Sequence, residues 1–124
     1  LMPAHVIDKV APGMALYRDE SFGPVVGIVR ARDEAQAIEL ANDTEYGLSA
    51  AVFTRDTARG LTVARQIKSG ICHVNGPTVH DEAQMPFGGT KASGYGRFGG
   101  KAAIDAFTEL RWITIETQTG HFPI

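Results

Sequence analysis

The run Val25-Val26-Gly27-Ile28-Val29 is short, β-branched and almost continuously apolar, which is typical of a strand buried on both faces. Asp33 follows at the N-cap of a predicted helix over 33–43, and Gln36 lies three residues later as in a loose capping box. The next apolar run, 48–53, predicts a second strand. The fold is decided by this alternation of strand and helix.

A second helix and a third strand continue the pattern. Thr54 or Asp56 caps a predicted helix whose apolar residues form one stripe, and Ile71-Cys72-His73-Val74 predicts the third strand. Gly70 lies where a helix end favours a left-handed residue. Because the connections are short, we predict an α/β fold with an open, mainly parallel sheet built from a βαβαβ unit.

The second half of the chain differs in composition. Residues 75–100 are rich in glycine and proline and show little periodicity, which predicts a long and often functional loop. Residues 101–110 predict a short helix, and 111–117 alternate like a half-buried strand. The first residues, 1–7, resemble the inside of a strand, so we expect a chain cut from a longer one.

The composition of the chain indicates which kinds of binding partner to expect. The 124 residues are 44% hydrophobic and 21% charged, which suits a globular chain with a core. The net charge of -2 gives no electrostatic reason to expect nucleic acid or an anionic membrane as partner. The single cysteine, Cys72, excludes an internal disulfide and fits a reducing compartment. We therefore expect a soluble, cytoplasmic protein.

One literal G-x-G-x-x-G pattern occurs at 94–99, ahead of the predicted C-terminal helix. A dinucleotide-binding fingerprint requires a strand leading directly into the first glycine, and 90–93 has no strand character. We favour a glycine-rich loop that turns sharply or packs tightly. The alternative, an independent dinucleotide site, predicts cofactor affinity that vanishes in Gly96→Val.

Cys72 and His73 are neighbours along a predicted strand, so their side chains point to opposite faces and cannot form a dyad there. We interpret Cys72 as a small apolar packing residue. The histidines lack metal-ligand spacing, so no metal site is predicted; they are His5, His73, His80 and His121.

The segment Glu20-Ser21-Phe22-Gly23-Pro24 precedes the first predicted strand. Pro24 keeps Gly23 out of helical geometry, which holds Glu20 and Phe22 at the strand entrance. A carboxylate beside an aromatic ring suits a sugar hydroxyl and a flat ring. A helix-end acid and a core phenylalanine are equally consistent with the residues alone.

Four blocks of the chain, in order and spacing, resemble the aldehyde dehydrogenase superfamily. They cover nearly the whole length and are Glu20-Ser21-Phe22-Gly23-Pro24, 45–54, 70–75 and 86–97. The loop 76–85 and the tail are similar in style to dehydrogenases of aromatic aldehydes, such as the vanillin, benzaldehyde and salicylaldehyde enzymes. Thr90 and Phe98-Gly99 depart from the family pattern, within the loop packing.

The resemblance implies oxidation of an aldehyde to the acid with NAD or NADP, through a cysteine thiolate and a glutamate base. By the family motif, Glu20 binds the nicotinamide ribose hydroxyls and Phe22 packs near the nicotinamide. Phe87 and the loop 78–85, which contains His80, border the aldehyde channel. By the same motif, four residues of the glycine-rich loop hold that loop against the rest of the domain: Lys91, Gly94, Gly96 and Arg97.

The resemblance also implies what this chain lacks. The nucleophilic cysteine, the glutamate base and the dinucleotide-binding domain of the family all precede the first block. Residues 1–110 are therefore expected to be the C-terminal part of the catalytic domain, and 111–124 an oligomerisation strand and tail that joins a neighbouring subunit. We expect this chain alone to be inactive.

A non-catalytic module that exposes its last strand to a partner is the alternative reading.

Overall fold

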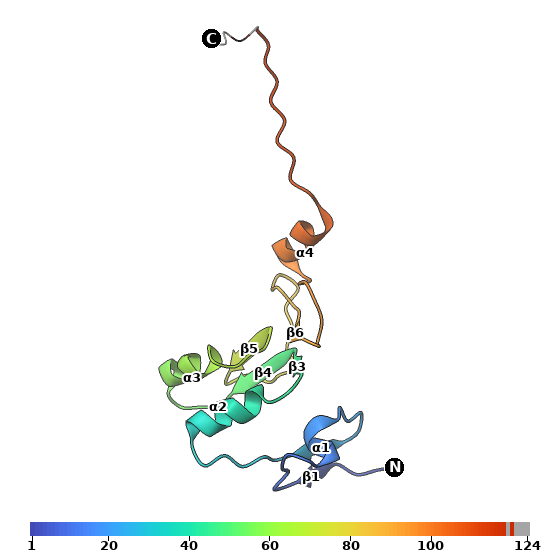
Figure 1. Ribbon diagram of the computed structural model, residues 1–124, viewed down its shortest axis with the longest axis vertical. Helices are drawn as coiled ribbons and strands as arrows, with labels where there is room; N and C mark the ends of the chain where they lie inside the picture. Colours follow the sequence, from blue (N-terminus) through green and yellow to red (C-terminus); the bar gives the residue numbers. More distant parts are fainter. Residues whose placement is uncertain (119, 121–124) are drawn as a thin grey trace.

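The computed structural model describes residues 1–118 and 120, and Figure 1 shows them as small folded pieces followed by an extended segment. In this described part the strands form three two-stranded sheets, β1–β2, β3–β6 and β4–β5. Two of the three pairs are parallel, so the predicted mainly parallel α/β class is confirmed.

The first piece pairs β1 (His5–Ile7) with β2 (Val25–Gly27) in parallel, and α1 (Ala15–Arg18) lies between them in sequence. Val10 packs under this pair and is 4% exposed. A Cβ built on Gly27 would lie 3.1 Å from a methyl of Val10, so the glycine lets the strand approach that side chain. Strand β2 corresponds to the predicted run 25–29, shortened at its end.

The second piece is the predicted parallel pair β4 (Ser49–Val52) and β5 (Ile71–Val74), joined through α3 (Thr57–Ala64). The helix begins at Asp56, whose carboxylate accepts a 3.0 Å hydrogen bond from the backbone N–H of Arg59. Gly60 is buried against β5. A Cβ there would lie 2.8 Å from a methyl of Val74, so this position has no room for a side chain. The capping and the missing side chain together allow α3 to lie on the sheet.

Helix α2 (Glu34–Asn42) begins as predicted at Asp33, whose carboxylate accepts from the backbone N–H of Gln36 at 2.8 Å. The Gln36 side chain in turn accepts from the backbone N–H of Arg32, which completes the capping box one residue early. An open cavity of about 590 Å³ lies between α2, α3 and β4, with Ile38 and Val63 among its apolar lining.

The third piece pairs β3 (Tyr46–Gly47) with β6 (Thr90–Lys91), and this pair is antiparallel. Strand β6 lies inside the predicted glycine-rich loop. Helix α4 (Gly100–Phe107) follows that loop and corresponds to the predicted helix over 101–110. Beyond α4 the chain runs extended and away from the folded pieces in Figure 1.

One detail of the predicted architecture is corrected. Among the described residues the strands do not join into one open sheet, because β2 takes β1 as its neighbour and β4 takes β5. Residues 111–117, predicted to form a strand, pair with no other strand of the described chain. Residues 119 and 121–124 of the predicted tail lie outside the described residues.

Gly70 has a different role from the predicted one. Its φ is not in the left-handed region, but a Cβ built on it would lie 1.8 Å from the carbonyl oxygen of Gly88. Gly88 and Gly89 are both buried. The backbones of β5 and of the loop before β6 therefore touch directly, and only a residue without a side chain allows that approach.

Few apolar side chains are covered. Among the described residues Val10 alone is a buried hydrophobic residue, whereas Phe22, Tyr95, Phe107 and Trp112 are each more than 80% exposed. Contiguous exposed apolar surface marks an interaction site on a folded chain. No helix within residues 1–118 and 120 combines the length and apolarity needed to cross a membrane.

Replacing Gly70 with alanine should destabilise the protein by about 1–3 kcal/mol or more, since the new methyl group collides with backbone that cannot rotate away. Gly23→Ala is the matched control, because a Cβ there meets nothing within 4 Å and its φ is not left-handed. Urea unfolding of both variants beside the unmodified protein measures the difference. Equal stability of the two variants would contradict the close backbone contact.

Candidate functional site

Glu20 lies in the segment that leads from α1 to β2, as the sequence predicts. Glu20 lies on the lining of an open cavity of about 430 Å³ together with Tyr17, Arg18 and Asp19. The lining also includes the segment 46–50 and residues before β5, among them Lys68 and Ser69. A carboxylate on one wall of such a cavity can accept hydrogen bonds from a hydroxyl-bearing ligand.

Phe22 lies outside the cavity lining and is 96% exposed. The structure therefore brings Glu20 to a cavity but leaves the ring of Phe22 open to the surroundings. An uncovered aromatic face next to a carboxylate fits a flat ring attached to a sugar.

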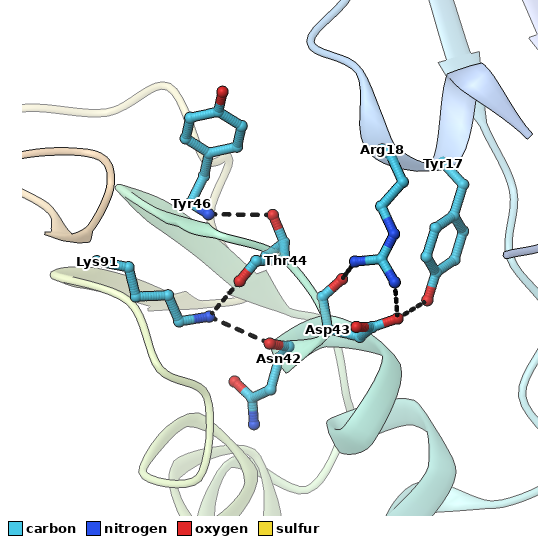
Figure 2. Close-up of polar contacts among 7 residues, drawn as sticks. All are labelled: Tyr17, Arg18, Asn42, Asp43, Thr44, Tyr46 and Lys91. Atoms are coloured by element: carbon cyan, nitrogen blue, oxygen red, sulfur yellow. Dashed lines mark hydrogen bonds and ion pairs between the residues drawn. The ribbon is translucent and has the colours of Figure 1, made fainter. Parts of the chain in front are cut away.

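The segment before Glu20 is held by Asp43, the C-cap residue immediately after α2 (Figure 2). The hydroxyl of Tyr17 donates to Asp43 Oδ2 at 2.6 Å, and Arg18 Nη2 donates to the same oxygen at 3.2 Å. Arg18 Nη1 also donates to the Asp43 carbonyl oxygen at 3.3 Å. These hydrogen bonds tie α1 to the end of α2. Arg18, which makes two of them, lies two residues before Glu20.

The contacts of Tyr17 and Arg18 with Asp43, called the clamp below, shift the pKa values of Asp43 and Tyr17. The hydrogen bond from Tyr17, aided by the charges of Arg18 and Lys91, lowers the pKa of the Asp43 carboxyl. The same hydrogen bond, now seen from the phenol, raises the pKa of Tyr17. At neutral pH the pair is therefore a neutral donor and an ionised acceptor, which is the stronger arrangement.

Lys91 binds the same helix end from the other side (Figure 2). Its Nζ donates to the carbonyl oxygens of Asn42 at 3.1 Å and Thr44 at 3.0 Å. The last carbonyls of a helix lack intrahelical donors, and a cation satisfies them well. Arg97 Nη1 likewise donates to the Gly89 carbonyl at 2.7 Å. Lys91 and Arg97 thus tie the loop to the end of α2 and to its own backbone.

The two predicted channel residues, His80 and Phe87, line one cavity of about 370 Å³ beside β5. Phe87 is held by a pair of backbone hydrogen bonds with Phe98, of 2.9 and 2.7 Å. The ring of His80 lies edge-on to that of His73, with their centroids 5.5 Å apart. The sequence analysis did not place His73 here, and no motif marks it.

Cys72 behaves as a packing residue. It is half-buried in β5, and burial raises the pKa of its thiol, which keeps the group protonated at neutral pH. Over the described ranges no hydrogen bond joins it to His73, and no cluster of three metal-ligating side chains occurs. His121 lies outside the described residues.

The G-x-G-x-x-G pattern forms a turning loop. Gly94, Gly96 and Gly99 all have positive φ, and Gly99 passes close to the Met85 carbonyl. Helix α4 does follow the pattern, but β6 ends at Lys91 and is antiparallel to β3. The strand–turn–helix geometry of a dinucleotide fingerprint is therefore not formed.

Comparison with known proteins identifies the class. The sequence model of the aldehyde dehydrogenase family matches residues 1–113. The chain belongs to the aldehyde dehydrogenase family.

Several similar proteins are named as vanillin or salicylaldehyde dehydrogenases. It is 60% identical over 119 residues to a vanillin dehydrogenase of Pseudomonas fluorescens, covering 96% of this chain and 25% of that protein. The crystal structure of a salicylaldehyde dehydrogenase from Pseudomonas putida G7, complexed with salicylaldehyde, superposes with a TM-score of 0.90 and 51% identity. That match covers 100% of this chain and 26% of the other.

A further solved structure carries a cofactor. The aldehyde dehydrogenase of Mycobacterium tuberculosis complexed with NAD⁺ matches with a TM-score of 0.79 and 36% identity, over 84% of this chain and 21% of that chain. The chain thus spans about a quarter of the length of the relatives it matches.

Asp43→Asn should lower the melting temperature at neutral pH, because the amide keeps the shape of the clamp but loses its charge. The pKa of Asp43 in the folded protein lies below its ordinary value of 3.8, so its stabilising contribution is present above that pH and lost as the pH falls through the lowered value. We expect the difference between variant and wild type to shrink under acid conditions.

Melting curves at a series of pH values between neutral and strongly acidic measure this difference. Asp19→Asn is the control, since the Asp19 carboxylate makes no hydrogen bond among the described residues. A difference that stays constant down to the most acidic condition would show that the charge of Asp43 is not what holds α1.

Proposed function

We propose that this chain supplies the nicotinamide-ribose contact and one wall of the aldehyde channel in an NAD- or NADP-dependent aldehyde dehydrogenase. The observation that carries the proposal is the placement of Glu20 on one cavity and of His80 and Phe87 on another, within a chain that belongs to this family. The substrate is proposed to be an aromatic aldehyde, which is oxidised to its carboxylic acid.

The residues present account for binding and positioning. Glu20 accepts hydrogen bonds from the ribose hydroxyls, and Phe22 offers its exposed face to the nicotinamide. When bound, NAD or NADP accepts the hydride of the aldehyde. Phe87 presents a flat apolar wall for an aromatic substrate.

We propose that the nucleophilic cysteine and the glutamate base lie outside these 124 residues. The protonated state of Cys72 and its lack of a neighbouring base support this view. The exposed apolar side chains support it as well, because residues such as Phe53 and Ile104 need a covering partner. The isolated chain is then inactive.

Residues 1–110 would form part of the catalytic domain, and 111–124 the oligomerisation strand and tail. Trp112, Ile113 and Ile115 are exposed on an extended, unpartnered segment, which suits addition to a sheet of a neighbouring subunit. A non-catalytic module that uses the same segment is the competing function. The single cysteine supports a reducing compartment, and we propose the cytoplasm.

The test uses a chimaera in which this chain replaces the matching residues of the Pseudomonas fluorescens vanillin dehydrogenase. We expect the chimaera to form NADH or NADPH from benzaldehyde or vanillin, and the 124-residue chain to form none. Glu20→Gln should raise the KM for the dinucleotide by about tenfold, the value of one hydrogen bond to a charged group. Glu45→Gln, an exposed glutamate whose side chain is unbonded in the described structure, is the control.

Cys72→Ser should leave the turnover of the chimaera unchanged. Turnover by the short chain that disappears in Cys72→Ser would instead place the nucleophile in β5. A folded chimaera that oxidises no aldehyde would favour the non-catalytic module.

A further inference from the structure

The start of helix α4 lies against the loop that precedes β6. Gly99 is the N-cap of α4, and no side chain of the described residues caps this helix end. The first N–H groups of a helix need acceptors from outside it, and that of Gly100 donates to the carbonyl oxygen of Ala83 at 3.1 Å. The helix start is therefore in direct backbone contact with the loop segment 83–87.

This contact depends on the two glycines, because they have no side chains. A Cβ built on Gly99 would collide with the carbonyl oxygen of Met85 and lie 3.0 Å from that of Ala83. A Cβ on Gly100 would lie 2.5 Å from the carbonyl oxygen of Gln84. Both glycines have a φ in the left-handed region, +83° and +47°, which side chains disfavour. Three consecutive carbonyl groups of the loop thus lie against two glycines.

The segment that the glycines hold is part of the cavity beside β5. Met85, Pro86 and Phe87 line this cavity of about 370 Å³, and the two glycines lie outside its lining. Phe87 and Phe98 continue the contact, because their backbones exchange hydrogen bonds of 2.9 and 2.7 Å. The backbone of 98–100 therefore determines where this part of the lining lies.

We propose that Gly99 and Gly100 are positioning residues of the aldehyde channel, which fix the place of Phe87 against an aromatic ring. The inference rests on the proposed function, in which Phe87 is a wall of that channel, and it adds the residues on which this wall depends. Their effect reaches the substrate through the segment 85–87. Among the described residues, the lining of the cavity of Glu20 includes none of 83–87 and 98–100, so the dinucleotide contact does not depend on them.

The test measures kcat/KM for benzaldehyde and for acetaldehyde, and the KM for the dinucleotide, in the chimaera with Gly99→Ala. The new methyl group displaces the Met85 carbonyl, so kcat/KM for benzaldehyde should fall by about tenfold, within what a misplacement of about 1 Å costs. Acetaldehyde has no ring to pack against Phe87, so its kcat/KM should stay nearly unchanged. The KM for the dinucleotide should stay nearly unchanged as well.

Gly13→Ala is the matched control. Gly13 has a φ of +92°, close to that of Gly99, but a Cβ there meets nothing of the described chain within 4 Å. The control therefore carries the same backbone strain without the collision. Its kinetic constants should be those of the unmodified chimaera, and its melting temperature should fall less than that of Gly99→Ala.

Gly100→Ala is the second variant, because its methyl group meets the carbonyl of Gln84, which lies outside the cavity lining. It should show the same kinetic pattern, and it decides the question if Gly99→Ala does not fold. Equal falls for both aldehydes, a raised KM for the dinucleotide or unchanged kinetics in a folded variant would overturn the proposal. So would the failure of both variants to fold when Gly13→Ala folds. Absence of turnover by the unmodified chimaera would instead overturn the proposed function.

Discussion

The C-terminal end of α2 is the point on which the described structure depends. A helix leaves its last carbonyl groups without intrahelical donors, so this end needs donors from elsewhere. Three separate segments supply contacts there: Arg18 from α1, Lys91 from β6, and Lys68, whose backbone N–H donates to the Asn42 side chain at 2.7 Å. Since the apolar core is so small, these polar contacts define how the pieces of the chain meet.

Neighbouring residues of the segment that leads into β5 line the two cavities. The cavity of Glu20 includes Ser69, and the cavity of His80 begins at the next residue, Gly70. The start of β5 therefore borders both, and its position depends on the contact of Gly70 with the backbone of Gly88. Hydride transfer requires the aldehyde and the nicotinamide to lie close together, so a shared border at one strand is the arrangement that the proposed function needs.

Features set by short-range chemistry could be predicted from the sequence. The N-caps at Asp33 and Asp56 depend on neighbouring residues. The parallel pairing of β4 with β5 follows from the short helical connection between them. The division into separate sheets could not be predicted, because an apolar run does not specify which strand becomes its partner. The family motifs predict a binding role for Glu20, which stays a prediction, and the structure places this residue on the lining of a cavity.

The contacts missed by the sequence analysis are those between distant residues. Asp43 marks a helix end in the sequence, but nothing local indicates that a tyrosine 26 residues earlier donates to it. His73 lies in a strand of apolar residues, and no motif marks it. The structure shows that its Nε2 is buried and that its ring lies edge-on to that of His80.

The uncovered apolar residues explain why such polar clamps matter. Burying a large apolar side chain contributes about 1.5–3 kcal/mol, and this chain forgoes that gain at most of its large apolar residues. Under the proposed function, those apolar residues gain it from contacts with further polypeptide. The hydrogen bonds at the end of α2 hold α1 and Lys91 in place without that apolar packing.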